Sequence, residues 1–186
     1  MKRLVALSAL STILLTACTP KDVMKIGFIG PLTGDAAAIG QDMLHGTQWA
    51  IEEINGDGGI NGKKVVLVAE DGKCTGAEAA NAAQKLVNVD KVIVIVGGLC
   101  SGETLAAAPI TEAAQVVLLS PGSSSPDVTQ AGDFVFRNYP SDALKTKATA
   151  KYFKEKGYKR IAMISENTDF STAFRTSLKK DVGENA

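Results

Sequence analysis

The chain has 186 residues, of which 45% are hydrophobic and 22% are charged, and this balance is typical of a globular protein. Its 20 basic and 20 acidic side chains cancel, which argues against nucleic-acid binding because that function needs a basic patch. The chain from residue 18 onward is long enough for one domain of ordinary size, and no later stretch is long and apolar enough to span a membrane.

The first 17 residues have the layout of a secretory signal. Two basic residues precede an apolar run over residues 4–15, which is too short to span a bilayer as a mature helix. The run ends in Leu15-Thr16-Ala17-Cys18, which resembles the lipobox of bacterial lipoproteins, where the signal is cut before the cysteine and its thiol receives a lipid. We therefore expect export and lipidation of Cys18. The alternative is an ordinary signal whose cleavage site happens to precede a cysteine.

Strands and helices alternate after a linker that we expect over residues 18–24. The apolar pattern predicts strands at 25–29, 65–69, 92–96 and 116–119, and helices at 43–54, 77–89 and 104–114. This order predicts a parallel, doubly wound α/β sheet with helices on both faces. Ligands of such sheets bind beyond the carboxyl ends of the strands, so the loops at those ends are the candidates for function.

Residues 25–140 are predicted to form this first lobe, and residues 141–186 the beginning of a second lobe. A short strand is expected at 134–137. Leu144, Ala148 and Tyr152 predict the apolar stripe of a helix whose lysines form a solvated face. A strand at 160–165 and a helix at 170–181 should follow. A final βα unit with no following strand indicates that the sequence is truncated.

Two cysteines, Cys74 and Cys100, remain after the predicted signal is removed. Export places them in an oxidising compartment, where an isolated pair forms a disulfide more often than a metal site. Both follow predicted neighbouring strands, so we expect them to be bonded to each other. No metal site and no cofactor are expected, and the one histidine, His45, is expected on a helix surface.

Three loops at the carboxyl ends of the strands carry polar groups. Residues 97–102 place Ser101 where a helix N-cap belongs, so its hydroxyl and the free amides of the next turn could bind a carboxylate; simple capping is the alternative. Residues 120–126 hold serines and a glycine between two prolines, and could offer donors to a carboxylate and acceptors to an ammonium. The alternative is a polar turn in which Ser125 caps a short helix. The first loop, 30–40, lacks the ending of a phosphate loop.

Taken together, these segments resemble the type I periplasmic binding proteins, and most closely the branch that binds leucine, isoleucine and valine. The resemblance runs from residue 24 to about residue 178. The matching motifs are Gly30-Pro31-Leu32-Thr33-Gly34, residues 50–55 with 58–62, Glu70-Asp71 with Cys74, Leu99-Cys100-Ser101 and Ser120-Pro121-Gly122.

The resemblance implies a ligand site at matching positions. Ser101 would bind the α-carboxylate of an amino acid, Ser124 would bind through its hydroxyl and amide, and the Gly122 carbonyl would accept from the α-ammonium. Further site residues would be Leu99, Cys100, Ser123, Phe170 and Ile39. Of these, Phe170 and Ile39 stand where relatives often have tyrosine, and the acid that pairs with the ligand ammonium would lie beyond residue 186.

The function implied by the resemblance is that of an extracytoplasmic lipoprotein that binds an amino acid for an ABC-transporter permease, in the periplasm or at the cell surface. It implies no enzymatic activity. A sensory ectodomain of the same fold is one alternative. A cysteine hydrolase is another, because residues 98–102 have the G-x-C-x-G form of a nucleophile elbow. Cys100 would then need a base, and His45 lies on an early helix.

Overall fold

The computed structural model describes residues 23–183, so the predicted signal and Cys18 lie outside the described residues. Parallel strands form one sheet in the order β2-β1-β3-β4-β5. Their bounds are β1 Val23–Gly30, β2 Lys64–Asp71, β3 Val94–Gly97, β4 Val117–Ser120 and β5 Val135–Arg137. The strand order reverses direction between β1 and β3, and ligands of open α/β sheets bind beside such a switch point.

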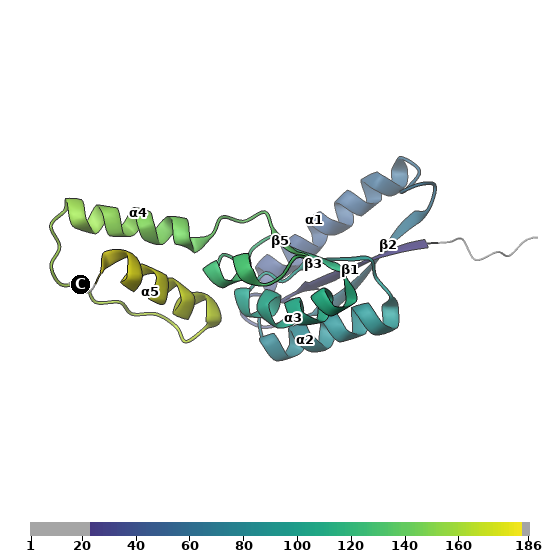
Figure 1. Cartoon of the computed structure of the whole chain (residues 1–186). Coiled ribbons are helices and arrows are strands. Elements are labelled where there is room, and N and C mark those ends of the chain that lie inside the picture. The colour runs from purple at the N-terminus through teal and green to yellow at the C-terminus, as the bar shows by residue number, and fades with distance from the viewer. Residues whose placement is uncertain (1–22, 184–186) are drawn as a thin grey trace, which may run out of the picture.

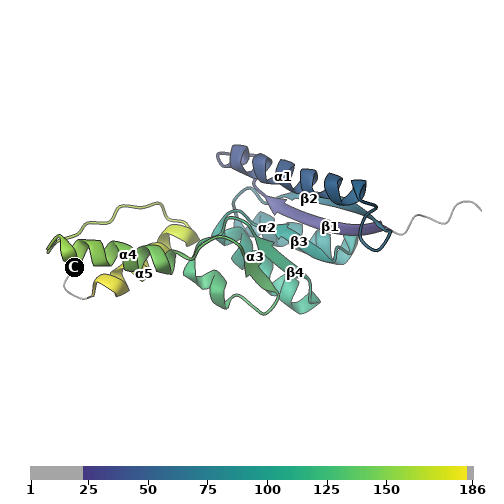
Figure 2. The ribbon, with the colours of Figure 1, turned by 90° about the horizontal axis from the view of Figure 1, so that it is seen from above.

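Helices cover both faces of the sheet, as Figures 1 and 2 show, with α1 on one face and α2 and α3 on the other. The helix α4 and the helix α5 lie side by side beyond the carboxyl ends of the strands. The α-helices are α1 Ala37–Gly56, α2 Gly76–Lys85, α3 Ser101–Ala114, α4 Asp142–Glu155 and α5 Asp169–Val182. A π-helical turn, η1 Leu86–Asp90, extends α2, and a 3-10 turn, η2 Pro126–Gln130, follows β4. The predicted doubly wound α/β fold is confirmed.

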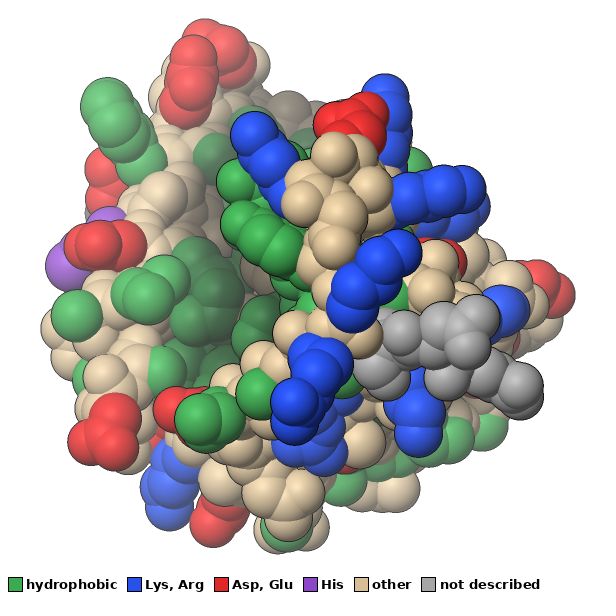
Figure 3. All heavy atoms as spheres, turned by 90° about the vertical axis from the view of Figure 1, so that its left-hand side faces the viewer, with side chains coloured by type: hydrophobic (Ala, Val, Ile, Leu, Met, Phe, Trp, Pro, Cys, Tyr) green, Lys and Arg blue, Asp and Glu red, His purple; other side chains and the backbone are tan. Residues whose placement is uncertain are grey.

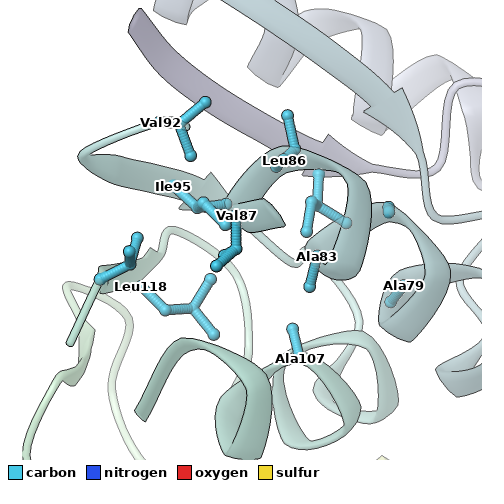
Figure 4. Packing of buried hydrophobic residues seen from close by; sticks show 11 residues of the cluster. Ala79, Ala83, Leu86, Val87, Val92, Ile95, Ala107 and Leu118 are labelled. Carbon is cyan, nitrogen blue, oxygen red and sulfur yellow. The ribbon is translucent and has the colours of Figure 1, made fainter. Parts of the chain in front are cut away.

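The main core lies between the sheet and the pair α2–α3 (Figure 4). Small side chains on the helices let them approach each other and the sheet closely, while branched side chains of the strands fill the space between. The cluster contains Ala79, Ala82, Ala83, Leu86, Val87 and Ala107 from the helical side, and Ile29, Val92, Ile95, Val116 and Leu118 from the strands and the residues before them. A Cβ at Gly27 would lie 3.0 Å from the Leu86 side chain, so a larger residue in β1 would press on the π-helical turn.

The opposite face of the sheet is covered unevenly. The helix α1 packs on β1 and β2, where Phe28 and Ile51 are buried. Farther along the sheet, Leu119 of β4 and Phe136 of β5 are 36% and 51% exposed. Seen from the α4–α5 end, the molecule has a hollow in which hydrophobic side chains are visible, with lysine and arginine side chains gathered to one side of it (Figure 3).

Several element boundaries differ from the prediction, and one predicted strand is absent from the described residues. The strand β1 begins at Val23, two residues inside the expected linker, because it pairs with β2 along its whole length. Residues 160–165 were expected to form a strand and form none. A strand exists only where its backbone groups pair with a neighbour, and the described residues place no other strand beside this segment.

The predicted face of α4 is also wrong. Leu144 and Tyr152 of the expected apolar stripe are exposed, whereas Asp142, Thr146 and Ala150 are buried. The buried positions recur every four residues on the side of α4 that lies against its neighbours, chiefly α5. Polar groups hold this contact, because the Thr146 hydroxyl bonds with Ser177 and Asp181 of α5. Hydrophobicity alone therefore indicates the wrong face.

Candidate ligand-binding cleft

A cleft of about 700 Å³ lies at the carboxyl ends of the strands, between the sheet loops and the N-terminal end of α5. The loops after β2, β3 and β4 form one wall, and the segment leading into α5 forms the other. The residues that line it are Cys74, Thr75, Gly76, Leu99, Cys100, Ser101, Gly102, Gly122, Ser124, Tyr139, Lys145, Glu166, Asn167, Thr168, Asp169, Phe170 and Thr172. The cleft thus occupies the edge where the strand order predicts a ligand.

A disulfide between Cys74 and Cys100 joins the loop after β2 to the loop after β3, with the two Cα atoms 5.3 Å apart. The predicted pairing is confirmed. Cys74 has a left-handed backbone with φ of 58°. Gly97, which starts the second loop, has φ of 148°, and a Cβ there would lie 2.1 Å from the Ile29 carbonyl oxygen, so only glycine fits. Because Cys100 is bonded to another cysteine, it has no free thiol for a nucleophile.

Ser101 is not the N-cap that the sequence suggested. The cap is Cys100, and Ser101 is the first residue of α3, with 2% of its surface exposed. The helix starts one residue early because the Glu103 carboxylate accepts from the Cys100 backbone N–H, as in a capping box. The Ser101 hydroxyl accepts from the Ser125 N–H at 3.2 Å, so its own hydrogen remains available for an acceptor in the cleft.

Two serines tie the β4 loop to the β3 loop behind the cleft wall. The Ser120 hydroxyl donates to the Gly98 carbonyl at 2.7 Å and accepts from the Ser123 N–H at 3.0 Å. The Ser123 hydroxyl shares a 2.7 Å hydrogen bond with Thr104 and also reaches the Gly98 carbonyl. Both serines are fully buried. The structure therefore places Ser123, which was predicted to bind ligand, in the support of the loop.

Ser124 faces the cleft and is held by the first residue of α4. Its hydroxyl donates to Asp142 Oδ2 at 2.7 Å, and its carbonyl accepts from the Asp142 N–H at 2.8 Å. Since the hydroxyl hydrogen is used in this way, Ser124 Oγ can act toward a ligand only as an acceptor. The fully buried Asp142 is in turn paired with the Lys145 ammonium at 2.8 Å.

Several cleft residues escaped prediction. Lys145 was assigned to a solvated lysine face, but its hydrogen bond to Asp142 raises the pKa of its ammonium and holds the charge at the cleft, 5.4 Å from the centre of the Tyr139 ring. Glu166 and Asp169 bring carboxylates from the other wall. In the sequence these three residues look like ordinary surface charges, so it held no signal for their place at the cleft.

Eight positions were predicted to bind the ligand, and Ser123 has been placed behind the cleft wall. Six of the other seven line the cleft. Leu99, Cys100, Ser101, Gly122, Ser124 and Phe170 line the cleft together. Ile39 lies on the first turn of α1, is 59% exposed and is not among the residues that line the cleft.

The cleft offers complementary groups for a zwitterion. The Ser101 hydroxyl and the free amides at the start of α3 form a donor set for an anion. Ser124 Oγ and the Glu166 carboxylate offer acceptors for a cation, whereas the Asp169 carboxylate lies against the start of α3, where a Cβ at Gly102 would be 2.5 Å from its Oδ2. Within residues 23–183, no three His, Cys, Asp or Glu side chains are grouped closely enough to hold a metal ion. None of the helices in that range is both long and apolar enough to cross a bilayer.

Known proteins are similar to this chain in sequence and fold. Residues 23–185 match the family described as periplasmic binding protein. An amino acid binding protein of Pseudomonas aeruginosa is 39% identical over 131 residues, which are 70% of this chain and 35% of that protein. A leucine-binding protein of Thermotoga maritima superposes with a TM-score of 0.76 at 34% identity, over 86% of this chain and 45% of that one.

A solute-binding protein of an ABC transporter from Rhodopseudomonas palustris, solved with 4-hydroxybenzoate, superposes with a TM-score of 0.74 at 26% identity, over 87% of this chain and 44% of that one. The chain spans less than half the length of each of these three proteins. The family match nevertheless runs through the whole of the described structure. The chain therefore belongs to the type I periplasmic binding protein family.

Proposed function

We propose that the intact protein is an exported solute-binding protein that binds an amino acid for an ABC importer. Residues 25–140 would form the first lobe, and the second lobe would begin at residue 141. One observation carries the proposal: the cleft presents a donor, the Ser101 hydroxyl, and an acceptor, Ser124 Oγ, on adjoining loops of the same wall. The leucine-binding and amino-acid-binding relatives supply the ligand class.

In this proposal the ligand lies against the first-lobe wall. Its α-carboxylate accepts from Ser101 and from the amides at the start of α3. Its α-ammonium donates to the Gly122 carbonyl and to Ser124 Oγ. The ligand side chain then contacts Leu99 on one wall and Phe170 on the other, both of which line the cleft.

The proposal includes a lipid on Cys18 that holds the protein at a membrane of the cell envelope, and a permease that receives the ligand. Both rest on the lipobox-like segment and on the family. A cysteine hydrolase is not proposed, since the Cys100 sulfur is bonded to Cys74. A sensory ectodomain would use the same cleft and would differ only in the partner.

A thermal-shift screen of the intact protein tests the ligand class. The panel holds L-amino acids, their amides, short organic acids and 4-hydroxybenzoate. We expect an aliphatic L-amino acid to raise the melting temperature, because a ligand at about 100 times its Kd adds about 2.7 kcal/mol to the apparent stability. The matched amino-acid amide, which lacks the carboxylate, should give a much smaller shift. A response to 4-hydroxybenzoate and to no amino acid would contradict the proposal.

A further inference from the structure

The side chain of Glu103 lies fully buried one turn into α3, directly behind the cleft wall. Its Oε1 accepts from the Cys74 N–H at 3.0 Å, and its Oε2 accepts from the Cys100 N–H at 3.0 Å. Each carboxylate oxygen therefore holds a different loop, one after β2 and one after β3. These are the two loops that the disulfide also joins.

Both loops leave room for this carboxylate where it passes between them. A Cβ at Gly72 would lie 2.2 Å from Glu103 Oε1, and a Cβ at Gly98 would lie 2.4 Å from Glu103 Cβ. Neither loop could carry a larger residue there without displacing the Glu103 side chain. The space for the Glu103 carboxylate is therefore formed by two glycines, which leave room for it, and by two backbone amides that point toward it.

A disulfide and a buried carboxylate constrain these loops differently. The Cys74–Cys100 bond limits the separation of two Cα atoms, but the peptide planes on either side can still rotate. A carboxylate that accepts from the Cys100 N–H fixes the direction of the Leu99–Cys100 peptide plane, which lies one peptide before the plane that leads into Ser101. The orientation of the Ser101 hydroxyl and of the first α3 amides therefore depends on Glu103.

We propose that Glu103 is a positioning residue of the ligand site, which holds the backbone of residues 99–101 in its binding orientation independently of the disulfide. Its effect on binding rests on the proposed function, whereas its effect on the loops does not. The substitution Glu103→Gln tests both. An amide side chain keeps the shape but has one acceptor oxygen, so its NH₂ group must face a backbone N–H and one loop must be released.

The helix α3 provides a matched control in Glu112. This residue also accepts from two backbone amides through its two oxygens, from Phe134 at 2.5 Å and from Asp133 at 3.0 Å. It lies near the other end of the helix and does not line the cleft. The substitution Glu112→Gln therefore breaks the same kind of contact at a place where it should not change ligand affinity.

Amide hydrogen exchange of the intact protein without ligand is the first measurement. We expect Glu103→Gln to speed exchange at residue 74 or residue 100 by about tenfold or more, as one buried hydrogen bond is lost, with no change in β1 and β3. A Cys74→Ser/Cys100→Ser variant should keep these two amides protected. Unchanged protection in Glu103→Gln, or lost protection in the double serine variant, would overturn the proposal.

The second measurement is the affinity for L-leucine as a function of pH. If Glu103 only stabilised the loops, the pH dependence of this affinity would be unchanged by its substitution. Burial raises the pKa of Glu103 above the ordinary 4.5, and the backbone amides that bond to it act in the opposite direction. The negative charge of Asp71, at the end of β2, raises the pKa further. Affinity of the wild type should therefore fall as the pH drops through this raised pKa and the carboxylate loses acceptor capacity. Glu103→Gln should bind about tenfold more weakly at neutral pH and lack this fall, while Glu112→Gln behaves as wild type.

Equal affinities and equal pH profiles for Glu103→Gln and wild type would overturn the positioning role in binding. If the wild type does not bind L-leucine or any other amino acid, the proposed function fails instead. The exchange rates of the two loop amides still decide in that case whether Glu103 sets their orientation.

Discussion

The serine hydroxyls at the cleft differ in what they have left to offer a ligand. Ser101 accepts from a backbone amide and keeps a hydrogen to donate, whereas Ser124 has given its hydrogen to Asp142 and keeps only lone pairs. Ser123 is fully occupied with Thr104 and the Gly98 carbonyl. One residue type therefore supplies a donor, an acceptor and a structural support, according to its neighbours.

We expect Ser101→Ala to weaken binding of the amino acid identified in the screen by about 1–3 kcal/mol, since a charged carboxylate loses a hydrogen bond in a closed cleft. The matched substitution Ser123→Ala removes buried hydrogen bonds without facing the cleft. It should lower the free energy of unfolding by about 1 kcal/mol and leave affinity within about twofold. Calorimetry and urea unfolding of both variants separate the effects. Equal losses of affinity would contradict this division of roles.

Asp71 provides a pH-dependent contribution to stability. Its Oδ1 accepts from the Leu32 N–H at 2.8 Å and the Lys73 N–H at 3.0 Å, and its Oδ2 accepts from the Thr33 hydroxyl at 2.5 Å. Burial acts to raise its pKa, but these hydrogen bonds together outweigh burial and lower the pKa below 3.8. The folded pKa is thus below the unfolded one, so the stabilisation is present at neutral pH and lost as the pH falls through the folded value.

We expect Asp71→Asn to lower the free energy of unfolding at pH 7 by about 1 kcal/mol, a small value because solvent screens this carboxylate. The difference from wild type should shrink as both proteins are taken toward about pH 3. Urea unfolding at the two pH values measures it. A difference that stays constant with pH would show that the ionised form of Asp71 contributes nothing.

At the scale of elements, the disulfide links two crossovers that the sheet alone leaves separate. Cys74 and Cys100 are 26 residues apart in sequence, so their bond closes a loop of moderate length in the unfolded chain. On the chain-entropy account, such a loop stabilises the fold by about 3 kcal/mol. We expect Cys74→Ser/Cys100→Ser to lose this amount in urea unfolding, and wild type in reductant to lose the same. A loss in reductant only would indicate a chemical side effect of the reductant.

The order of elements in the first 140 residues could be predicted because apolar patterns of period two and 3.6 alternate cleanly there. Apart from the disulfide, the side-chain contacts that set element ends and buried faces could not. The start of α3 depends on the Glu103 carboxylate reaching back to Cys100, and the buried face of α4 depends on hydroxyls that pair with α5. The cleft loops were predicted from the positions of strand ends. Lys145 is held at the cleft by Asp142, which contacts Ser124 across 18 residues of sequence, and that contact could not be predicted.

At the scale of the whole molecule, the lipid proposal makes a direct prediction about location. Cys18→Ser should convert the exported protein from membrane-associated to soluble, or leave it as an unprocessed precursor, because the acyl chains are then missing. Detergent-phase partitioning of cells that produce each protein measures this. Ala17→Ser, which leaves the cysteine in place, serves as the control. A Cys18→Ser protein that partitions like wild type would end the lipoprotein proposal.

The direction of β1 determines how a tethered molecule would stand on a surface. Val23 marks the start of the strand and Gly30 its end, and the cleft lies beyond the end, on the side of α4 and α5 (Figure 1). Four residues lie between Cys18 and Val23, so the five steps from one Cα to the other span at most about 17 Å. A bilayer holding Cys18 would therefore lie near the amino ends of the strands, and the mouth of the cleft would point away from it. A ligand would arrive from the open aqueous side. Delivery to a permease in the same bilayer would require the molecule to rotate about the linker after Cys18 until the cleft faces the membrane.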